Sequence, residues 1–358
     1  MRRALTVLVL LAALPYRAFA QKLGVEMLTD LELWKTHGDS PLLARNEGDL
    51  QAVGRLRGWV SLRPFAELQL LAMGELEKET GAEGEFEKEL EVLTLRWLPR
   101  RGMSVEAGRI LMPLGEFGPR RFSNINPLIG TPDLYPDAYP WGTSVSGAAG
   151  KLDYRAALIS LPVVNQGRTP EPGQRLRPLL GVGVSAGPML RVGATLTHGA
   201  YLGPAVGEQI PSGASWQDFS QTVVSADARF SAGYVEARVE ALWSSFEVPS
   251  RADPVRGLGW YGEVRATLSP RLFVAGRFER NRFATIEPTS ASVWAGQVAT
   301  ELNGEVGAGY RVSADALIKA SFSKDHWPGA QPGVSAGYAL AVQFSLHTDI
   351  GALLARRY

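Results

Sequence analysis

The sequence of 358 residues contains no cysteine and only four histidines, and its formal net charge is +1. Without cysteine, disulfides, cysteine-based metal sites and cysteine nucleophiles are excluded, so the chain must be held by its own sheet or core. The near-balanced charge gives no reason to expect a nucleic acid as a partner. Nothing in the composition indicates a cofactor.

Motifs of catalysis are lacking as well. No serine or aspartate stands in a recognisable catalytic arrangement with any of the histidines, which are His37, His198, His326 and His347. The sequence has no G-x-S-x-G, no H-E-x-x-H and no glycine-rich loop that would hold a phosphate. We therefore expect neither an enzyme nor a metal site.

A long apolar run occurs only at the N-terminus. Arginines precede the apolar residues 4–14, and a small-x-small cleavage site ends at Ala20, which is the pattern of a secretory signal peptide. The apolar run stops at Pro15 and is too short for a membrane-anchoring helix. The sequence predicts export with cleavage after Ala20, and a mature chain of residues 21–358 without a membrane-spanning helix.

Apolar and polar residues alternate through most of the remaining chain, and glycine is abundant, with 39 residues. In residues 235–243, for example, valine, alanine and tryptophan fall at odd positions, whereas Glu236, Arg238 and Glu240 fall between them. A period of two is the pattern of a strand with one apolar face. Apolar stripes at helical spacing are rare, so we predict an all-β protein.

About sixteen strands can be placed by this pattern, and the connections between them alternate strictly between short and long. The predicted strands are 24–36, 50–62, 65–76, 87–98, 103–111, 143–149, 152–161, 178–186, 190–199, 221–230, 233–246, 257–268, 271–282, 301–312, 315–325 and 335–348. The predicted long connections are 37–49, 77–86, 112–142, 162–177, 200–220, 247–256, 283–300 and 326–334. Asn303-Gly304 is a hairpin signal inside this scheme, and we interpret it as a bulge or a loop extension.

This rhythm separates two all-β folds. A soluble β-sandwich shows the same alternation but has no reason to keep all its short turns at one end, whereas a transmembrane barrel has short periplasmic turns and long external loops. An even strand number also closes the sheet and pairs every edge. The sequence therefore predicts a transmembrane antiparallel β-barrel of about sixteen strands, with its charged face toward a water-filled lumen. The aromatic residues that fit interfacial girdles are Trp59, Trp97, Trp243, Trp260 and Tyr310.

The longest connection, residues 112–142, contains proline at positions 113, 119, 127, 132, 136 and 140. Each proline lacks a backbone donor and has a fixed φ, so the segment forms neither a regular helix nor a central strand. A connection of this length is either functional or disordered, and its prolines favour a semi-rigid path. We interpret it as the candidate constriction loop of the barrel.

Charged residues of the inner face and of this loop are the candidate pore-lining residues. The loop charges either create a transverse field across a constriction or are solvated. Each wall arginine either contributes to selectivity or forms an ion pair with a glutamate of a neighbouring strand, such as Glu236, Glu240, Glu263 or Glu279. The predicted set is Arg55, Arg57, Arg120, Arg121, Asp133, Asp137, Arg191, Arg229, Arg238, Arg277 and Lys319.

An acidic run between Glu75 and Glu91 crosses the second long connection. We interpret it as a solvated loop; the alternative is that it binds divalent cations or, through them, bridges to lipopolysaccharide.

Two parts of the chain resemble Gram-negative porins, with the nearest likeness to the phosphate-selective porin O/P-like family. They are EAGRILMPLGEFGPRRFSNINPLIGTP, and EVGAGYRVSADALIKASFSKDHW with the later YALAVQFSLHTD. The resemblance implies a sixteen-stranded, commonly trimeric barrel whose third loop folds into the pore and narrows it. Phosphate-selective members rely on clustered lysines, whereas lysines here are few and scattered, so we carry over the architecture alone.

We thus expect an outer-membrane porin of a Gram-negative bacterium, through which small hydrophilic or ionic solutes diffuse passively. Its other expected partners are outer-membrane lipid and lipopolysaccharide, and the resemblance implies a homotrimer. A non-conducting barrel that acts as an adhesin or as a structural or assembly partner is the alternative. The near-balanced charge leaves the preference for anions or cations open.

Overall fold

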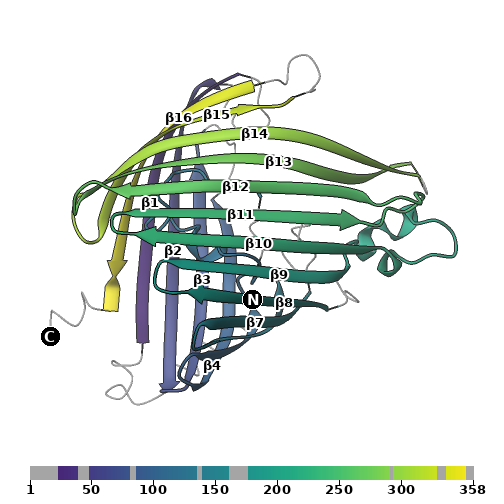
Figure 1. Ribbon diagram of the computed structural model, residues 1–358, viewed down its shortest axis with the longest axis horizontal. Coiled ribbons are helices and arrows are strands. Elements are labelled where there is room, and N and C mark those ends of the chain that lie inside the picture. Colours follow the sequence, from purple (N-terminus) through teal and green to yellow (C-terminus); the bar gives the residue numbers. More distant parts are fainter. Residues whose placement is uncertain are drawn as a thin grey trace.

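The computed structural model describes residues 23–38, 48–80, 86–134, 139–160, 176–290, 293–328 and 336–351. Sixteen antiparallel strands form one closed barrel, in which each strand pairs with its neighbours in sequence and β1 closes on β16 (Figure 1). The predicted fold class is therefore confirmed. The predicted signal peptide, residues 1–20, lies outside the described residues. Within the described ranges, no helix is long and apolar enough to cross a membrane.

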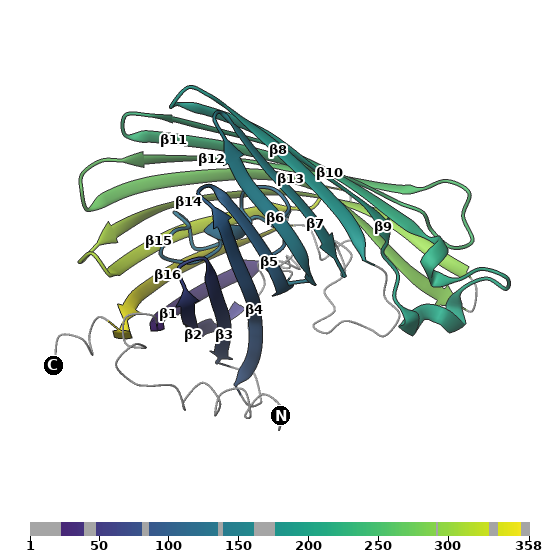
Figure 2. The same ribbon diagram turned by 90° about the horizontal axis from the view of Figure 1, so that it is seen from below.

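The strands are β1 (Leu23–Gly38), β2 (Leu50–Phe65), β3 (Leu68–Glu79), β4 (Glu87–Arg100), β5 (Met103–Arg109), β6 (Trp141–Ala149), β7 (Leu152–Ile159), β8 (Arg177–Ala186), β9 (Leu190–Ala200), β10 (Ser220–Ala232), β11 (Val235–Phe246), β12 (Val255–Thr267), β13 (Leu272–Ser290), β14 (Val293–Arg311), β15 (Ala316–His326) and β16 (Ala336–Asp349). Short 3-10 helices are η2 (Gly118–Arg120), η3 (Pro204–Gln209) and η4 (Trp216–Asp218). Figures 1 and 2 show the wall of β8–β14 facing the wall of β1–β4 across the barrel.

Two rows of side chains show how the alternation becomes an outside and an inside. The outer row runs across β8 to β12 through the register partners Leu180, Leu196, Val224, Trp243 and Leu258, and Leu180 is 60% exposed. The inner row runs across β10 to β15 through Asp227, Glu240, Tyr261, Glu279, Asn303 and Asp325, and Glu240 is 1% exposed. Apolar side chains thus cover the outer surface, and charged ones line the interior.

The connections separate into two ends of the barrel. Short turns join β2 to β3, β4 to β5 and so on to β14–β15, and we call this side the short-turn end. The other side, the long-loop end, differs from expectation between β13 and β14. The predicted loop 283–300 is wrong, because β13 and β14 stay paired through this segment as far as Ser290 and Val293. The pairing has one register shift, between Pro288 and Ser290. Asn303 and Gly304 pair regularly with β13, so they are neither a bulge nor a loop extension.

The acidic run is also placed differently from the prediction. Its described glutamates lie on β3 and β4, where Glu75 pairs with Glu89 and Glu77 with Glu87 across the inner face. They do not form a solvated loop, since they line the inner wall, where Arg55 and Arg57 on β2 contact Glu77 and Glu75. β3 extends to Glu79, beyond its predicted end at residue 76, whereas β4 begins at Glu87 as predicted.

The aromatic girdle prediction holds for part of its residues. Trp97, Trp243 and Tyr310 are exposed on the outer face. Trp59 instead points inward, where its ring meets Phe122 edge-on at 5.5 Å between ring centroids. Its role is therefore packing inside the barrel.

Candidate functional site

The connection between β5 and β6, residues 110–140, crosses the barrel interior, and we call it the inner loop. Two side chains and one backbone amide of this loop contact inward-facing carboxylates on distant strands. Ser123 Oγ donates to Asp30 on β1 at 2.5 Å, Arg121 contacts Glu91 on β4 at 3.2 Å, and the Glu116 amide donates to Glu240 on β11 at 2.5 Å. Since these strands lie on opposite walls, the inner loop occupies the lumen, as Figure 2 shows for the segment after β5.

Backbone amides of the inner loop are satisfied by carboxylates of the wall. The amides of Ile129 and Gly130 donate to Glu305 on β14 at 3.2 and 3.0 Å, and the Asp133 amide donates to Glu279 on β13 at 3.0 Å. A segment with this much proline cannot pair its own amides in a helix or strand, so its buried donors need other acceptors. The inner-face glutamates supply them.

Cations of the wall bind the carbonyl groups of the same loop. Lys319 Nζ on β15 donates to the carbonyls of Asn126 and Leu128 at 3.1 and 2.8 Å. Arg155 on β7 donates to the Gly115 carbonyl at 2.7 Å. The loop is therefore fixed by its main chain on both sides of the lumen, and it contains the 3-10 helix η2 and a hydrogen-bonded turn at Phe122.

An apolar cluster anchors the inner loop to the wall of β7 to β12. The loop contributes Ile110, Met112, Leu114, Phe117 and Leu134; the wall contributes Ala157, Ile159, Leu179, Val223, Leu242 and Tyr261. These wall positions face inward yet are apolar, which departs from the charged inner face elsewhere. Burial of apolar side chains at about 25 cal/mol per Å² stabilises the contact, so the cluster holds the loop against one side of the lumen.

Arg277 on β13 is the centre of a buried ion-pair network. Its guanidinium lies 2.8 Å from Glu279, 2.8 Å from Glu305 and 3.5 Å from Glu263, and its side chain is 2% exposed. Arg120 of the inner loop joins Glu263 at 2.5 Å. Because Glu279 and Glu305 also accept the loop amides, Arg277 holds the acceptors of the loop in place.

A second network occupies the wall of β1 to β5. Arg55 contacts Glu77 at 2.5 Å and Glu32 at 3.2 Å, and Arg57 contacts Glu75 and lies 3.9 Å from Asp30. Tyr139 Oη of the inner loop donates to Glu91 at 2.9 Å, which Arg121 also contacts. Arg191 on β9 joins a third group, formed with Asp153, Asp227 and Glu116.

The predicted site residues therefore divide by their contacts. Arg55, Arg57, Arg120, Arg121, Arg191 and Arg277 lie in ion pairs, and Lys319 binds loop carbonyls. Asp133 lies at the wall of β13 and β14, where burial raises the pKa of its carboxyl and the guanidinium of Arg277 opposes that shift. Asp137 lies outside the described residues.

Arg229 and Arg238 belong to a different environment near the short-turn end. With Arg265 and Arg311 they form what we call the arginine patch, on the inner face of β10, β11, β12 and β14. Arg229 pairs in register with Arg238, and Arg265 with Glu236. Glu236 is bound to Arg238, while Arg229, Arg265 and Arg311 form no ion pair within the part of the chain that the structure describes. Arg229 is exposed and the other three side chains are half-buried, so this patch presents net positive charge to the lumen.

Several of these residues were not predicted as site residues from the sequence. Glu305, Asp30 and Asn126 were not singled out, nor were Arg265 and Arg311. Arg265 and Arg311 can be identified from the alternation of β12 and β14, because they fall in the inward register of these strands. No signal identifies a carboxylate that accepts a loop amide from more than a hundred residues away.

Open space remains beside the inner loop. A cavity of about 260 Å³ lies between the loop residues Phe122 and Asn124 and the inner wall of β1 to β3, beside Trp59 and Gln69. Among the described residues, no group of histidine, aspartate and glutamate could hold a metal ion. The arrangement can therefore orient or sort dissolved solutes by charge and size.

No protein-family model matches the sequence, and no curated protein matches it. Among solved structures, the barrel is similar to the anion-selective porin from Comamonas acidovorans, with a TM-score of 0.59 and 12% identity over 91% of this chain and 99% of that one. It is also similar to in-vitro folded OmpT, an outer membrane protein of Vibrio cholerae, with a TM-score of 0.57 and 11% identity over 91% and 97% of the two chains. The resemblance to the phosphate-selective family stays a prediction. Identities this low show the fold alone, and that fold is the closed barrel of outer-membrane proteins.

Proposed function

We propose that this protein is a channel of the bacterial outer membrane through which small hydrophilic solutes diffuse passively, with a preference for anions. The inner loop narrows the lumen, and the arginine patch favours negative charge. The observation that carries the proposal is the proline-rich loop held across the interior by both walls.

The two faces of the wall support a water-filled interior. The outer row is apolar and exposed, whereas the inner row is charged. Charged side chains facing hydrocarbon are costly, so this distribution fits a barrel with lipid outside and water inside. The cavity beside Trp59 indicates that the loop leaves part of the lumen unfilled.

The preference for anions follows from which charges stay uncompensated. Around the inner loop, arginines lie beside carboxylates that cancel their charge. In the arginine patch one glutamate faces four arginines. A ring or cluster of unpaired cations in a pore attracts anions and raises their local concentration. The fold likeness to a protein named an anion-selective porin is consistent with this proposal.

No chemical step belongs to this proposal, since diffusion needs no turnover. The trimer implied by the family resemblance, and export by cleavage after Ala20, stay part of the proposal. The alternative is a non-conducting barrel that serves as an adhesin or as a structural partner.

Single-channel recording in a planar bilayer tests the channel itself. Refolded protein that runs as a heat-modifiable band should give stepwise conductance. Replacing residues 120–134 with a short glycine-serine linker should raise the conductance of each step, because the constriction is removed. The matched control deletes residues 211–214, in a connection whose apolar residues pack on Phe246 and Trp294 at the long-loop end, and should leave the conductance unchanged.

Folded protein without conductance steps would contradict the channel and favour the non-conducting barrel. Conductance that the linker variant leaves unchanged would contradict the constriction alone.

A further inference from the structure

Basic residues on the outer face of the barrel differ from those inside in their position and in their partners. Seven basic residues share the outward register of exposed apolar side chains: Lys35, Lys78, Lys88, Arg256, Arg280, Arg282 and Lys324. Lys78 follows Leu31 and Gly54 along one row of partners, and Arg282 follows Leu258. All but one of these cations lie in the half of their strand nearer the long-loop end, and Arg280 lies near the middle of β13.

None of these seven side chains forms an ion pair within the described part of the chain. The carboxylates of the strands offer them no partner, because every strand carboxylate whose side chain is described belongs to the inward register. A charge on the lipid side of a barrel is costly near the membrane centre and tolerated at the level of the headgroups. The described residues therefore supply these cations with no carboxylate partner on the outer face.

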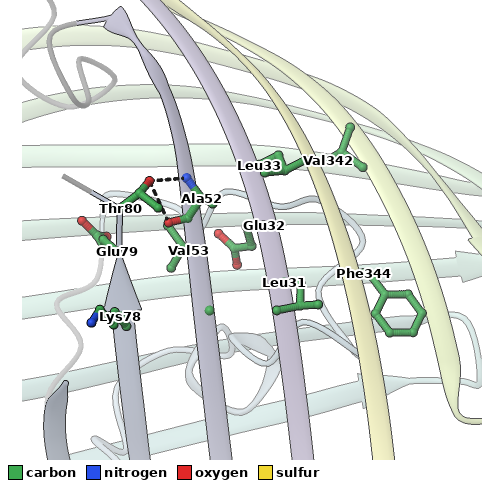
Figure 3. Close-up of a pocket in the computed structure, with 11 residues that line it drawn as sticks. Leu31, Glu32, Leu33, Ala52, Val53, Lys78, Glu79, Thr80, Val342 and Phe344 are labelled. Atoms are coloured by element: carbon green, nitrogen blue, oxygen red, sulfur yellow. Dashed lines mark hydrogen bonds between the residues drawn. The ribbon is translucent and has the colours of Figure 1, made fainter. Parts of the chain in front are cut away.

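A groove of about 690 Å³ begins beside one of these cations, on the outer surface of β16, β1, β2 and β3 (Figure 3). Its floor is formed by the small residues Ala52 and Gly54 of β2. One side is a ridge of apolar side chains, and the other is the end of β3. The ridge consists of Leu31, Leu33, Val342 and Phe344.

The end of β3 gives the groove a polar rim. Thr80 Oγ1 accepts from the Ala52 amide at 2.8 Å and donates to the Ala52 carbonyl, so its hydroxyl is occupied by the wall (Figure 3). Lys78 is exposed, and its ammonium lies 5.1 Å from the centre of the Phe86 ring. Lys88 is the register partner of Leu76, which places it diagonally beside Lys78 on the same face. Two ammonium groups without a carboxylate partner among the described residues thus stand at the headgroup end of an apolar groove.

We propose that this groove binds a phosphorylated lipid of the membrane leaflet on the long-loop side, with an acyl chain over Ala52 and Gly54 and a phosphate between Lys78 and Lys88. The site rests on the proposed placement of the barrel in the outer membrane. An acyl chain fits the apolar ridge and small-residue floor, and the two ammonium groups form charge-assisted contacts with the phosphate. The remaining outward cations provide the same charge around the rest of the barrel.

A second copy of the chain fits this surface less well. A partner barrel would bring its own outward face, on which the described strands carry cations and no carboxylates. Like charges would then face each other across the contact without a counter-ion. The lipid therefore explains both the groove and its charge.

Native mass spectrometry of the refolded full chain tests the site with two probes, bis-phosphorylated lipid A and its dephosphorylated form. The wild type should retain the phosphorylated probe, and the double variant Lys78→Gln, Lys88→Gln should bind it about tenfold more weakly. Gly54→Leu fills the floor, where an added Cβ would meet only Leu31 at 3.9 Å, and should weaken both probes. The matched control Lys151→Gln, in a short turn, should bind as the wild type does.

Equal retention of the two probes, or equal binding by the double variant, would overturn the phosphate site. An oligomer of the wild type that excludes lipid A, and that Gly54→Leu dissociates, would show that a second copy occupies the groove. Heat-modifiable migration confirms that each variant is folded, and the single variant Lys78→Gln replaces the double variant if that one fails to fold. Lipid binding by a protein without conductance would contradict the channel and support this site. Conductance by a protein that does not bind lipid A would contradict this site and support the channel.

Discussion

Arginines near the inner loop and arginines of the short-turn end occupy the same inner face but differ in their partners. Arg277 contacts three glutamates and is almost fully buried, whereas Arg229 stands beside Arg238 and is exposed. The first group fixes the constriction and the second leaves net charge in the lumen. We therefore propose that the register partners of an inward arginine decide whether it anchors the structure or contributes to selectivity.

The largest expected effect is the loss of unfolding free energy when Arg277, the centre of the buried ion-pair network, is replaced. Arg277→Met leaves the buried carboxylates of Glu263, Glu279 and Glu305 uncompensated, and removing one partner of a buried ion pair costs about 3–5 kcal/mol. Arg229→Met is the matched control and should cost below about 1 kcal/mol. Urea unfolding in lipid vesicles measures both. Equal losses for the two variants would remove the distinction between the groups.

A smaller effect is expected from the carboxyl of Asp133, and it depends on pH. Burial raises its pKa in the folded state, with Arg277 acting in the opposite sense. Its contribution to stability is therefore complete below the unfolded pKa of about 4 and is lost as the pH rises through the higher folded pKa. Asp133→Asn removes this loss, so its unfolding free energy should exceed that of the wild type increasingly as the pH rises. Parallel pH profiles of the two proteins would contradict the assignment.

The smallest expected effect concerns one hydroxyl group. Tyr139→Phe removes the hydrogen bond to Glu91 but keeps the ring, and should reduce the unfolding free energy by about 1 kcal/mol. Tyr154→Phe, on the outer face of β7 and without a contact to the loop among those described, is the comparison variant. Urea unfolding under the same conditions decides between them, and a larger loss for Tyr154→Phe would weaken the role given to Tyr139.

Sequence alone predicted the strands and their faces because a period of two is a local signal. It identified the inner loop from its prolines and its place after the fifth strand. It could not predict that Glu305 accepts the amides of Ile129 and Gly130, since that contact joins segments more than a hundred residues apart. It also misplaced the hairpin of β13 and β14, because Pro288 and the polar residues near it have the composition of a loop although the strands stay paired.

The reversal potential in a salt gradient tests the central claim most directly. The wild type should show a preference for chloride over potassium, and Arg229→Gln, Arg265→Gln, Arg311→Gln together should shift the reversal potential toward zero. The control loses the same charge in the short turns through Arg101→Gln, Lys151→Gln and Arg271→Gln, and should keep the preference of the wild type. A wild type that prefers cations, or a reversal potential that the triple variant leaves unchanged, would contradict the role of the arginine patch.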